Sequence, residues 1–156
     1  LKDALNLLKI ENTEIIIFGS SKPKEDESIK YKIHYVGHLY DDISLISLYC
    51  CADVMIVPSK QESFGQTASE AMACGTPVVA FNTTGLKDII DHKINGYLAE
   101  AFNSEDLKNG IEWILNNENY EILSKNARKK VVSHFSEEVL IPKFIELYKD
   151  ISTHKN

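Results

Sequence analysis

The sequence has 156 residues, of which 44% are hydrophobic and 26% are charged, so its length and composition fit a single globular domain. Its net charge of −6 disfavours a nucleic-acid partner, because proteins that bind nucleic acids usually present a basic surface. No apolar stretch approaches the ~18 residues that a membrane span requires, and the opening residues do not show a signal-peptide pattern.

The first residue is Leu1 rather than Met, so we expect the sequence to be part of a longer protein. Of the three cysteines, Cys50 and Cys51 are adjacent and Cys74 stands alone. This spacing matches neither a disulfide framework nor a metal site. We therefore predict that the cysteines are small buried side chains in a reducing compartment, and that the protein is cytoplasmic.

The predicted elements begin with the end of a helix, at residues 1–8. The apolar run at residues 14–18 predicts a buried strand that stops at Gly19. Residues 20–28 are polar and contain Pro23, which predicts a loop. Residues 30–36 alternate in polarity with a period of two, as in a half-buried strand, and end at Gly37.

The middle of the chain continues this alternation of helices and strands, which is typical of a parallel α/β sheet. Leu45, Leu48, Tyr49 and Ala52 share one face of a predicted helix. A buried strand follows at residues 54–57, then a short helix from about residue 65 to residue 73 that Gly75 ends. Residues 77–80 predict a strand, residues 85–90 a short helix, and residues 96–98 a last, brief strand.

Three amphipathic helices are predicted to complete the domain. Pro142 is expected to bend the last helix or to mark its start. That helix is apolar on more than one side, which predicts an exposed patch and hence self-association or a mobile tail.

The basic run at residues 128–130 is expected to be a solvated helix face, with membrane contact as the alternative. The helices carry Leu107, Ile111, Ile114 and Leu115, then Tyr120, Leu123, Ala127 and Val131, then Val139, Leu140, Ile141, Phe144, Ile145, Leu147, Tyr148 and Ile151.

Ligands of open parallel sheets bind beyond the carboxyl ends of the strands. This rule places Gly19 and residues 37–40, 58–65 and 82–85 along one edge. At residues 58–71 a buried strand ends, a polar loop carries Glu62, and Gly65 permits an unusual backbone angle or a close approach by a ligand. The helix that follows exposes unpaired N–H groups, which favours an anion site.

Glu62 and Glu70 are eight residues apart, roughly 12 Å on a helical path at ~1.5 Å per residue. That separation suits two sugar rings bridged by a diphosphate. It exceeds the ~5–5.5 Å between the paired carboxylates of a retaining glycosidase. Carboxylates accept hydrogen bonds from sugar hydroxyls, although either glutamate alone also fits an ordinary surface position.

The region from Pro58 to Ala80 resembles a motif of the family 4 (group 1) retaining glycosyltransferases, which have the two-domain GT-B fold. The matching residues read PSKQESFGQTASEAMACGTPVVA, and its two glutamates form the E-x7-E pair of the family. The likeness extends over nearly the whole chain. The resemblance implies a Rossmann-like open parallel sheet with flanking helices, the donor-binding half of that fold. Residues 1–156 would form this domain, and the helix at 137–151 would cross toward an N-terminal acceptor-binding domain.

The resemblance also implies roles for individual residues. Glu70 would accept hydrogen bonds from the donor ribose, and Glu62 would contact the donor sugar as the catalytic residue. The backbone at Phe64, Gly65, Gln66 and Thr67 would meet the sugar and phosphate at the helix start. Gly19 would admit the diphosphate, and the loop at His38, Leu39 and Tyr40 would lie near the base.

The family normally carries an Arg and a Lys just before the first helix, and the sequence begins after that segment. Such cations stabilise the departing diphosphate, so we expect these residues alone to be inactive. The strand that bears the Arg is central in the sheet of the family, and it is absent as well. Lys22 and Lys60 are the local candidates for contact with phosphate, the alternative being that they are solvated.

The expected ligand is a nucleotide-diphosphate sugar, with no cofactor and no metal. His34 and His38 do not present one ligand face, and neither a phosphate-binding loop nor a GxGxxG segment follows the first strand. Many relatives use lipid-linked acceptors, which adds the inner face of the membrane as a location. Two alternatives stay open: a sugar-nucleotide epimerase, and a non-catalytic module that binds a nucleotide or a protein.

Overall fold

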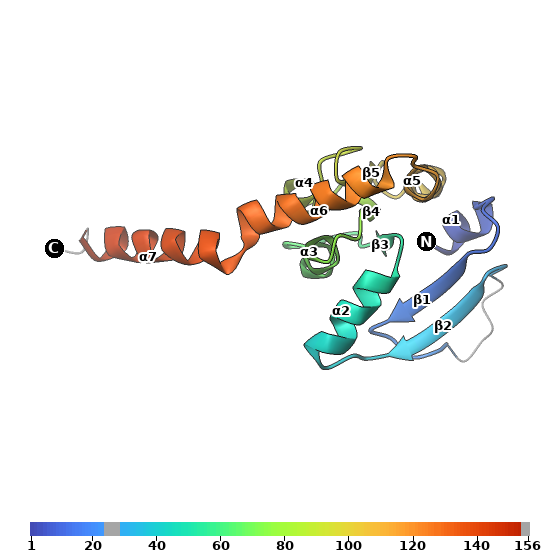
Figure 1. The fold of residues 1–156 in the computed structure, drawn as a ribbon, viewed down its shortest axis with the longest axis horizontal. Helices are drawn as coiled ribbons and strands as arrows, with labels where there is room; N and C mark the ends of the chain where they lie inside the picture. Colours follow the sequence, from blue (N-terminus) through green and yellow to red (C-terminus); the bar gives the residue numbers. More distant parts are fainter. Residues whose placement is uncertain (24–28, 154–156) are drawn as a thin grey trace.

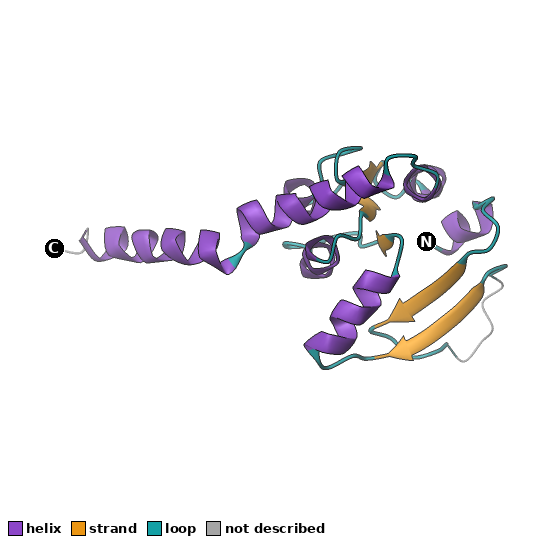
Figure 2. Cartoon of the chain, viewed as in Figure 1, coloured by secondary structure: helices purple, strands orange, loops and turns teal. Residues whose placement is uncertain are grey.

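The computed structural model describes residues 1–23 and 29–153, and it consists of parallel strands flanked by helices (Figures 1 and 2). Each predicted element is present, with ends that differ by one or two residues for most of them. The predicted loop at 20–28 lies partly outside the described residues. The strands are β1 (Glu14–Phe18), β2 (Lys32–Gly37), β3 (Met55–Val57), β4 (Val78–Phe81) and β5 (Gly96–Ala99). The helices are α1 (Lys2–Leu7), α2 (Asp42–Cys51), α3 (Gln66–Ala73), α4 (Leu86–Ile89), α5 (Ser104–Leu115), α6 (Tyr120–Phe135) and α7 (Glu137–Thr153).

The strands pair in parallel, as predicted for an α/β fold, but they form two sheets. β1 pairs with β2, whereas β3, β4 and β5 form a second sheet with β4 in the middle. β4 is buried at every position, which explains why its sequence is a continuous run of apolar residues. The edges of β1 and β3 that face away from their partners make no ladder hydrogen bonds within the described chain.

An apolar depression of about 920 Å³, which we call the interstrand slot, lies between β1 and β3. Its lining comes mainly from residues 12–19 and 51–59, with Leu1, Leu5 and Leu8 from the region of α1. The slot separates the two sheets, so the five strands do not form one continuous sheet. The two sheets are connected instead by packing, with α1 against α5 and α2 against α3.

The core lies on both faces of the β3–β4–β5 sheet. Because successive side chains of a strand point to opposite faces, Val78 and Ala80 pack with α3, α4 and α6, whereas Val79 and Phe81 pack with α1 and α5. A local signal starts α2, because the Asp41 carboxylate caps the helix by accepting from Ser44 N at 2.8 Å.

Helix α7 projects from the body of the molecule, with the C-terminus at its far end (Figure 1). None of its residues is buried. The helix begins at Glu137, so the expectation that Pro142 marks its start is wrong. Proline is tolerated there because the carbonyl that would lose its partner can bond to water. Its exposed apolar side chains confirm the predicted patch, while self-association itself stays a prediction; they are Ile141, Phe144, Ile145, Leu147, Tyr148 and Ile151.

The prediction of buried cysteines is wrong. Cys50 and Cys51 are exposed and Cys74 is half-buried. The reason is that α2 buries only the stripe that contains Tyr49, and the two positions that follow Tyr49 point away from it. Burial raises the pKa of the Cys74 thiol, and the neighbouring Cys50 raises it further.

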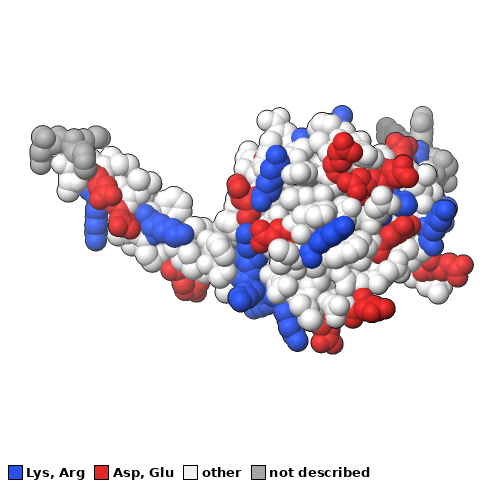
Figure 3. Space-filling model, turned by 90° about the horizontal axis from the view of Figure 1, so that it is seen from above, with Lys and Arg blue, Asp and Glu red and all other residues white. Residues whose placement is uncertain are grey.

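The basic run at residues 128–130 is only partly a solvated face. Arg128 donates to the carbonyl of Ala73, and Lys130 forms an ion pair with Asp91 at 3.0 Å. Lysines, arginines and acidic residues are interspersed on the face drawn in Figure 3. Among the residues described, no helix has the length and hydropathy that crossing a membrane demands.

Candidate functional site

The loop and helix at residues 58–73 begin where β3 ends. Gly65 starts α3 with a φ of +94°, a left-handed conformation that other residues rarely adopt. A Cβ atom on Gly65 would approach Leu86 Cδ2 of α4 to 2.7 Å. Of the two alternatives for Gly65, the structure confirms the unusual backbone angle. The close packing of α4 is a second reason why this position requires glycine. The left-handed backbone angle and this packing together determine where α3 starts.

Glu70 is held from two sides within half-buried surroundings. Tyr49 of α2 donates its hydroxyl to Glu70 Oε2 at 2.9 Å, and Gln66 Nε2 donates to Glu70 Oε1 at 3.0 Å. Burial and the Glu70 carboxylate raise the pKa of Tyr49, so its hydroxyl keeps the proton that it donates. A carboxylate has about four acceptor positions, so Glu70 can accept about two further hydrogen bonds from a ligand.

Glu62 lies in the loop between β3 and α3, and this loop is tied to the loop that follows β4. The Ser59 hydroxyl donates to Glu62 Oε1 at 3.0 Å. Glu62 N donates to Thr84 Oγ1 at 3.0 Å, and Gly85 N donates to the Glu62 carbonyl at 3.2 Å. The two loops therefore hold the Glu62 backbone from both sides, at the carboxyl edge of the second sheet.

The first amide groups of α3 are available to a ligand. Gly65 has no side chain to cap them, and the N–H groups of Gln66 and Thr67 have no partner among the described residues. Unpaired N–H groups at a helix start attract anions, because the positive end of the helix dipole lies there. This geometry fits the anion site that the sequence predicts.

Some of the predicted site residues share one depression. Gly19, at the end of β1, lines the interstrand slot together with Ser59 and Thr67. Gly19 N donates to the Gly37 carbonyl at 2.8 Å, which joins the ends of β1 and β2. The carboxyl ends of β1 and β3 thus approach the same end of the slot, next to the start of α3.

Other predicted residues lie apart from the slot. Leu39 follows β2 and is half-buried, while its neighbour Tyr40 is 91% exposed and stacks on His38. Lys60 and Lys22 are exposed and form no ion pair within the described chain.

The Phe64 side chain packs edge-to-face on Phe135 of α6, with ring centroids 5.2 Å apart.

His34 is within 2.6 Å of Glu14 Oε2, so its ring nitrogen is already engaged by the neighbouring strand. No group of three His, Cys, Asp or Glu residues with metal-binding geometry occurs among the residues described. The absence of a metal from the reaction stays a prediction.

Sequence reasoning missed Tyr49 as the residue that holds Glu70. It placed Ser59, Thr84 and Gly85 at the ligand edge, but it did not indicate that they hold Glu62. A buried tyrosine needs a hydrogen-bond partner for its hydroxyl, so Tyr49 on an apolar helix face gave a signal that a partner exists. The sequence could not name that partner, because Glu70 belongs to another helix.

Replacing Tyr49 by phenylalanine is expected to lower the free energy of unfolding by about 1 kcal/mol, because the variant loses the bond to Glu70. Urea denaturation at pH 7 measures the change. Tyr148→Phe is the matched control, since Tyr148 is 68% exposed on α7; its effect should stay below about 0.5 kcal/mol. Equal effects of the two substitutions would show that the Tyr49–Glu70 bond adds nothing to stability.

Comparison with known proteins shows which family and which fold the chain resembles. The sequence profile of the family described as "Glycosyl transferases group 1" matches residues 1–130. An uncharacterized glycosyltransferase of Methanocaldococcus jannaschii is 31% identical over 151 residues, which cover 92% of this chain and 38% of that protein.

Two solved structures have the same architecture. Sucrose-phosphate synthase of Thermosynechococcus elongatus superposes with a TM-score of 0.79 at 29% identity, over 91% of this chain and 39% of the other. HepE of Anabaena, in its complex with UDP-glucose, superposes with a TM-score of 0.82 at 22% identity, over 96% of this chain and 44% of the other. At that identity the second likeness concerns the fold alone.

The chain spans about two fifths of the length of these proteins, as the shares of 38%, 39% and 44% show. The profile covers most of the chain, including the region of Glu62, Gly65 and Glu70. The chain therefore belongs to the group 1 glycosyl transferase family.

Proposed function

We propose that this chain is the donor-binding domain of a retaining glycosyltransferase, and that it binds a nucleotide-diphosphate sugar. The parent protein would transfer a hexose to a hydroxyl acceptor. The observation that carries the proposal is Glu70, which is held by Tyr49 and Gln66 near the uncapped start of α3. This arrangement offers acceptors for sugar hydroxyls and donors for phosphate within one site.

Each part of the donor has a proposed partner. Glu70 accepts hydrogen bonds from the ribose hydroxyls, and the diphosphate lies against the first N–H groups of α3, with Lys60 in reach from the preceding loop. Glu62 accepts hydrogen bonds from the hydroxyls of the transferred sugar and is the proposed catalytic residue. Gly19 admits the diphosphate, and Leu39 lies toward the base.

The chemistry of the transfer is charge stabilisation by the protein, without a metal. The N–H groups at the start of α3 stabilise the negative charge that develops on the departing diphosphate. Cations supplied by the rest of the parent would complete this stabilisation, so the 156 residues alone are expected to bind the donor but not to transfer the sugar. An N-terminal acceptor-binding domain is the proposed partner of the exposed face of α7.

The proposal predicts that Glu70→Ala weakens nucleotide-sugar binding by at least about tenfold, since each hydrogen bond to a charged group contributes about 1.5–3 kcal/mol. Calorimetric titration with UDP-, GDP- and ADP-glucose and with the free nucleotides measures the affinity. Glu121→Ala is the matched control, because Glu121 lies on α6 with its side chain 88% exposed.

Binding of one base class that depends on both the sugar and Glu70 supports the donor site. Binding that ignores the sugar would instead indicate a nucleotide-binding module without transferase chemistry. Binding that is unchanged by Glu70→Ala contradicts the proposed site. If the 156 residues bind none of these ligands, the titration of the parent protein and its Glu70→Ala variant decides between a wrong site and an incomplete one.

A further inference from the structure

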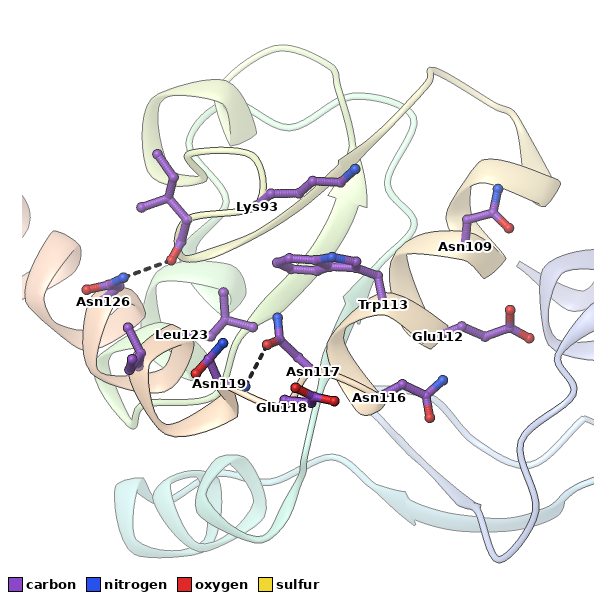
Figure 4. Close-up of a pocket in the computed structure, with 12 residues that line it drawn as sticks. Lys93, Asn109, Glu112, Trp113, Asn116, Asn117, Glu118, Asn119, Leu123 and Asn126 are labelled. Atoms are coloured by element: carbon purple, nitrogen blue, oxygen red, sulfur yellow. Dashed lines mark hydrogen bonds between the residues drawn. The ribbon is translucent and has the colours of Figure 1, made fainter.

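A second depression lies on the surface formed by α5 and α6 (Figure 4). It has a volume of about 890 Å³, near the upper end of the ~300–1,000 Å³ range of small-molecule sites, and it is open to solvent. Lys93, in the turn before β5, is part of its wall, so it lies at the amino end of that strand. Glu62 follows the carboxyl end of β3, and the strands are parallel. The depression and the proposed donor site are therefore at opposite edges of the sheet.

The lining of this depression is rich in side-chain amides, and we call it the amide pocket. Amides both donate and accept hydrogen bonds without carrying charge. Of the charged groups in the lining, Glu112 is already engaged, since Oε1 accepts from Lys9 N at 2.9 Å and Oε2 pairs with Lys108 at 3.4 Å. The positive charge of Lys93 and the negative charge of Glu118 balance one another, so the pocket favours a neutral ligand. The five amides belong to Asn109, Asn116, Asn117, Asn119 and Asn126.

Two of these amides are held in a known orientation. Asn126 Nδ2 donates to the Ile94 carbonyl at 3.1 Å, so Asn126 Oδ1 remains as an acceptor. Asn117 Oδ1 accepts from Asn119 N at 2.9 Å, so Asn117 Nδ2 remains as a donor. The described chain provides no hydrogen-bond partner for the side-chain amides of Asn109 and Asn116. The pocket thus presents donors and acceptors together, two of them oriented in advance.

Trp113 lies in the middle of the amide pocket, between Lys93 and Asn117 (Figure 4). Its indole is half-buried and packs on Tyr97, with ring centroids 6.0 Å apart, which fixes the ring in place. Asn109 and Trp113 of α5 and Asn116, which directly follows the helix, are spaced by four and three residues. They therefore share one face of the helix. A flat aromatic surface is flanked by amides along this face.

We propose that the amide pocket binds a neutral oligosaccharide. A pyranose ring has C–H faces that pack on an aromatic ring, and a rim of hydroxyls that both donate and accept hydrogen bonds. Trp113 matches the first property and the asparagines match the second. The volume exceeds the space that one sugar ring needs, so the depression has room for a ligand of two or more rings. This binding is separate from that of the donor, and it does not depend on the proposed donor function.

The test uses Trp113 as its own probe, because it is the one tryptophan of the sequence. The 156-residue chain is titrated with maltotetraose, cellotetraose and chitotetraose, and with a heparin tetrasaccharide as an anionic comparison. Tryptophan fluorescence and two-dimensional ¹⁵N–¹H NMR spectra follow the binding. The double variant Asn109→Ala/Asn116→Ala removes two surface amides and leaves the core unchanged. Glu146→Ala is the control, because Glu146 is exposed on α7 and belongs to neither site.

We expect a neutral tetrasaccharide to change the fluorescence saturably at millimolar concentrations and to shift the amide signals of residues 109–126. The double variant should weaken this binding at least about fivefold, and Glu146→Ala should leave it unchanged. The proposal is overturned if no neutral tetrasaccharide binds, if only the heparin fragment binds, or if the shifted signals lie around Glu62 and Glu70. Equal binding by the double variant also overturns it.

Discussion

Replacing Gly85 by alanine is expected to lower the free energy of unfolding by about 2–3 kcal/mol and to weaken donor binding. The added Cβ would lie 2.5 Å from the Ser63 carbonyl oxygen and 2.9 Å from Phe64 Cα. Gly85 has a φ of −64° and a ψ of −17°, which alanine adopts freely, so the cost arises from collision alone. The loop that carries Glu62 must move to relieve it, and the start of α3 moves with the loop.

Two measurements on the Gly85→Ala variant separate its effects. Urea denaturation gives the loss of stability, and calorimetric titration with a nucleotide sugar gives the loss of affinity under conditions where the variant is folded. Lys87→Ala, at an exposed position of α4, is the control and should change stability by less than about 0.5 kcal/mol. Full donor affinity in folded Gly85→Ala would mean that the position of the Glu62 loop does not matter for the donor.

The Gly96→Ala variant should lose about 3–4 kcal/mol of stability. Gly96 is buried at the start of β5 and is paired with Val78 of the central strand. A Cβ there would lie 2.5 Å from the Val78 carbonyl oxygen and 3.1 Å from Ile90 Cγ2. Backbone atoms of the central strand cannot move without disturbing both faces of the core. Thermal and urea denaturation should therefore show one of the larger single-residue losses in this domain.

Gly37→Ala is the informative control for Gly96→Ala. Gly37 has a φ of +69°, but a Cβ there would meet no atom within 4 Å. Its cost is the backbone strain of alanine in a left-handed conformation, about 1–2 kcal/mol. If Gly37→Ala destabilises the chain as much as Gly96→Ala, crowding at the β4–β5 pair is not the cause.

Local patterns predict most of the secondary structure. β4 has four consecutive apolar residues and is buried throughout, and α5 buries the stripe that its periodicity indicates. The spacing of Glu62, Gly65 and Glu70 correctly placed a loop and a helix start after β3. These features depend on the alternation of apolar residues and on turn residues, both of which can be read over a few positions.

The contacts that complete the candidate site could not be predicted in this way. The bond from Tyr49 to Glu70 joins two helices, and the proximity of Gly85 to Ser63 joins two loops that follow different strands. The exposure of Cys50 and Cys51 depends on how much of α2 the neighbouring elements cover. Each is decided by the packing of distant segments, about which local sequence carries no information.

The interstrand slot has a mechanical consequence for the proposed donor site. Gly19 belongs to the β1–β2 sheet, whereas Glu62 and Glu70 are carried by segments attached to the β3–β4–β5 sheet. No ladder hydrogen bond crosses the slot within the described chain, so helix packing and a few hydrogen bonds, such as those from Lys9 N to Glu112 and from Tyr49 to Glu70, set the separation of the two halves. Packing yields more readily to sliding than a hydrogen-bonded ladder does. The distance between the two halves of the proposed site can therefore change easily. A polypeptide strand bound in the slot would restrict this change.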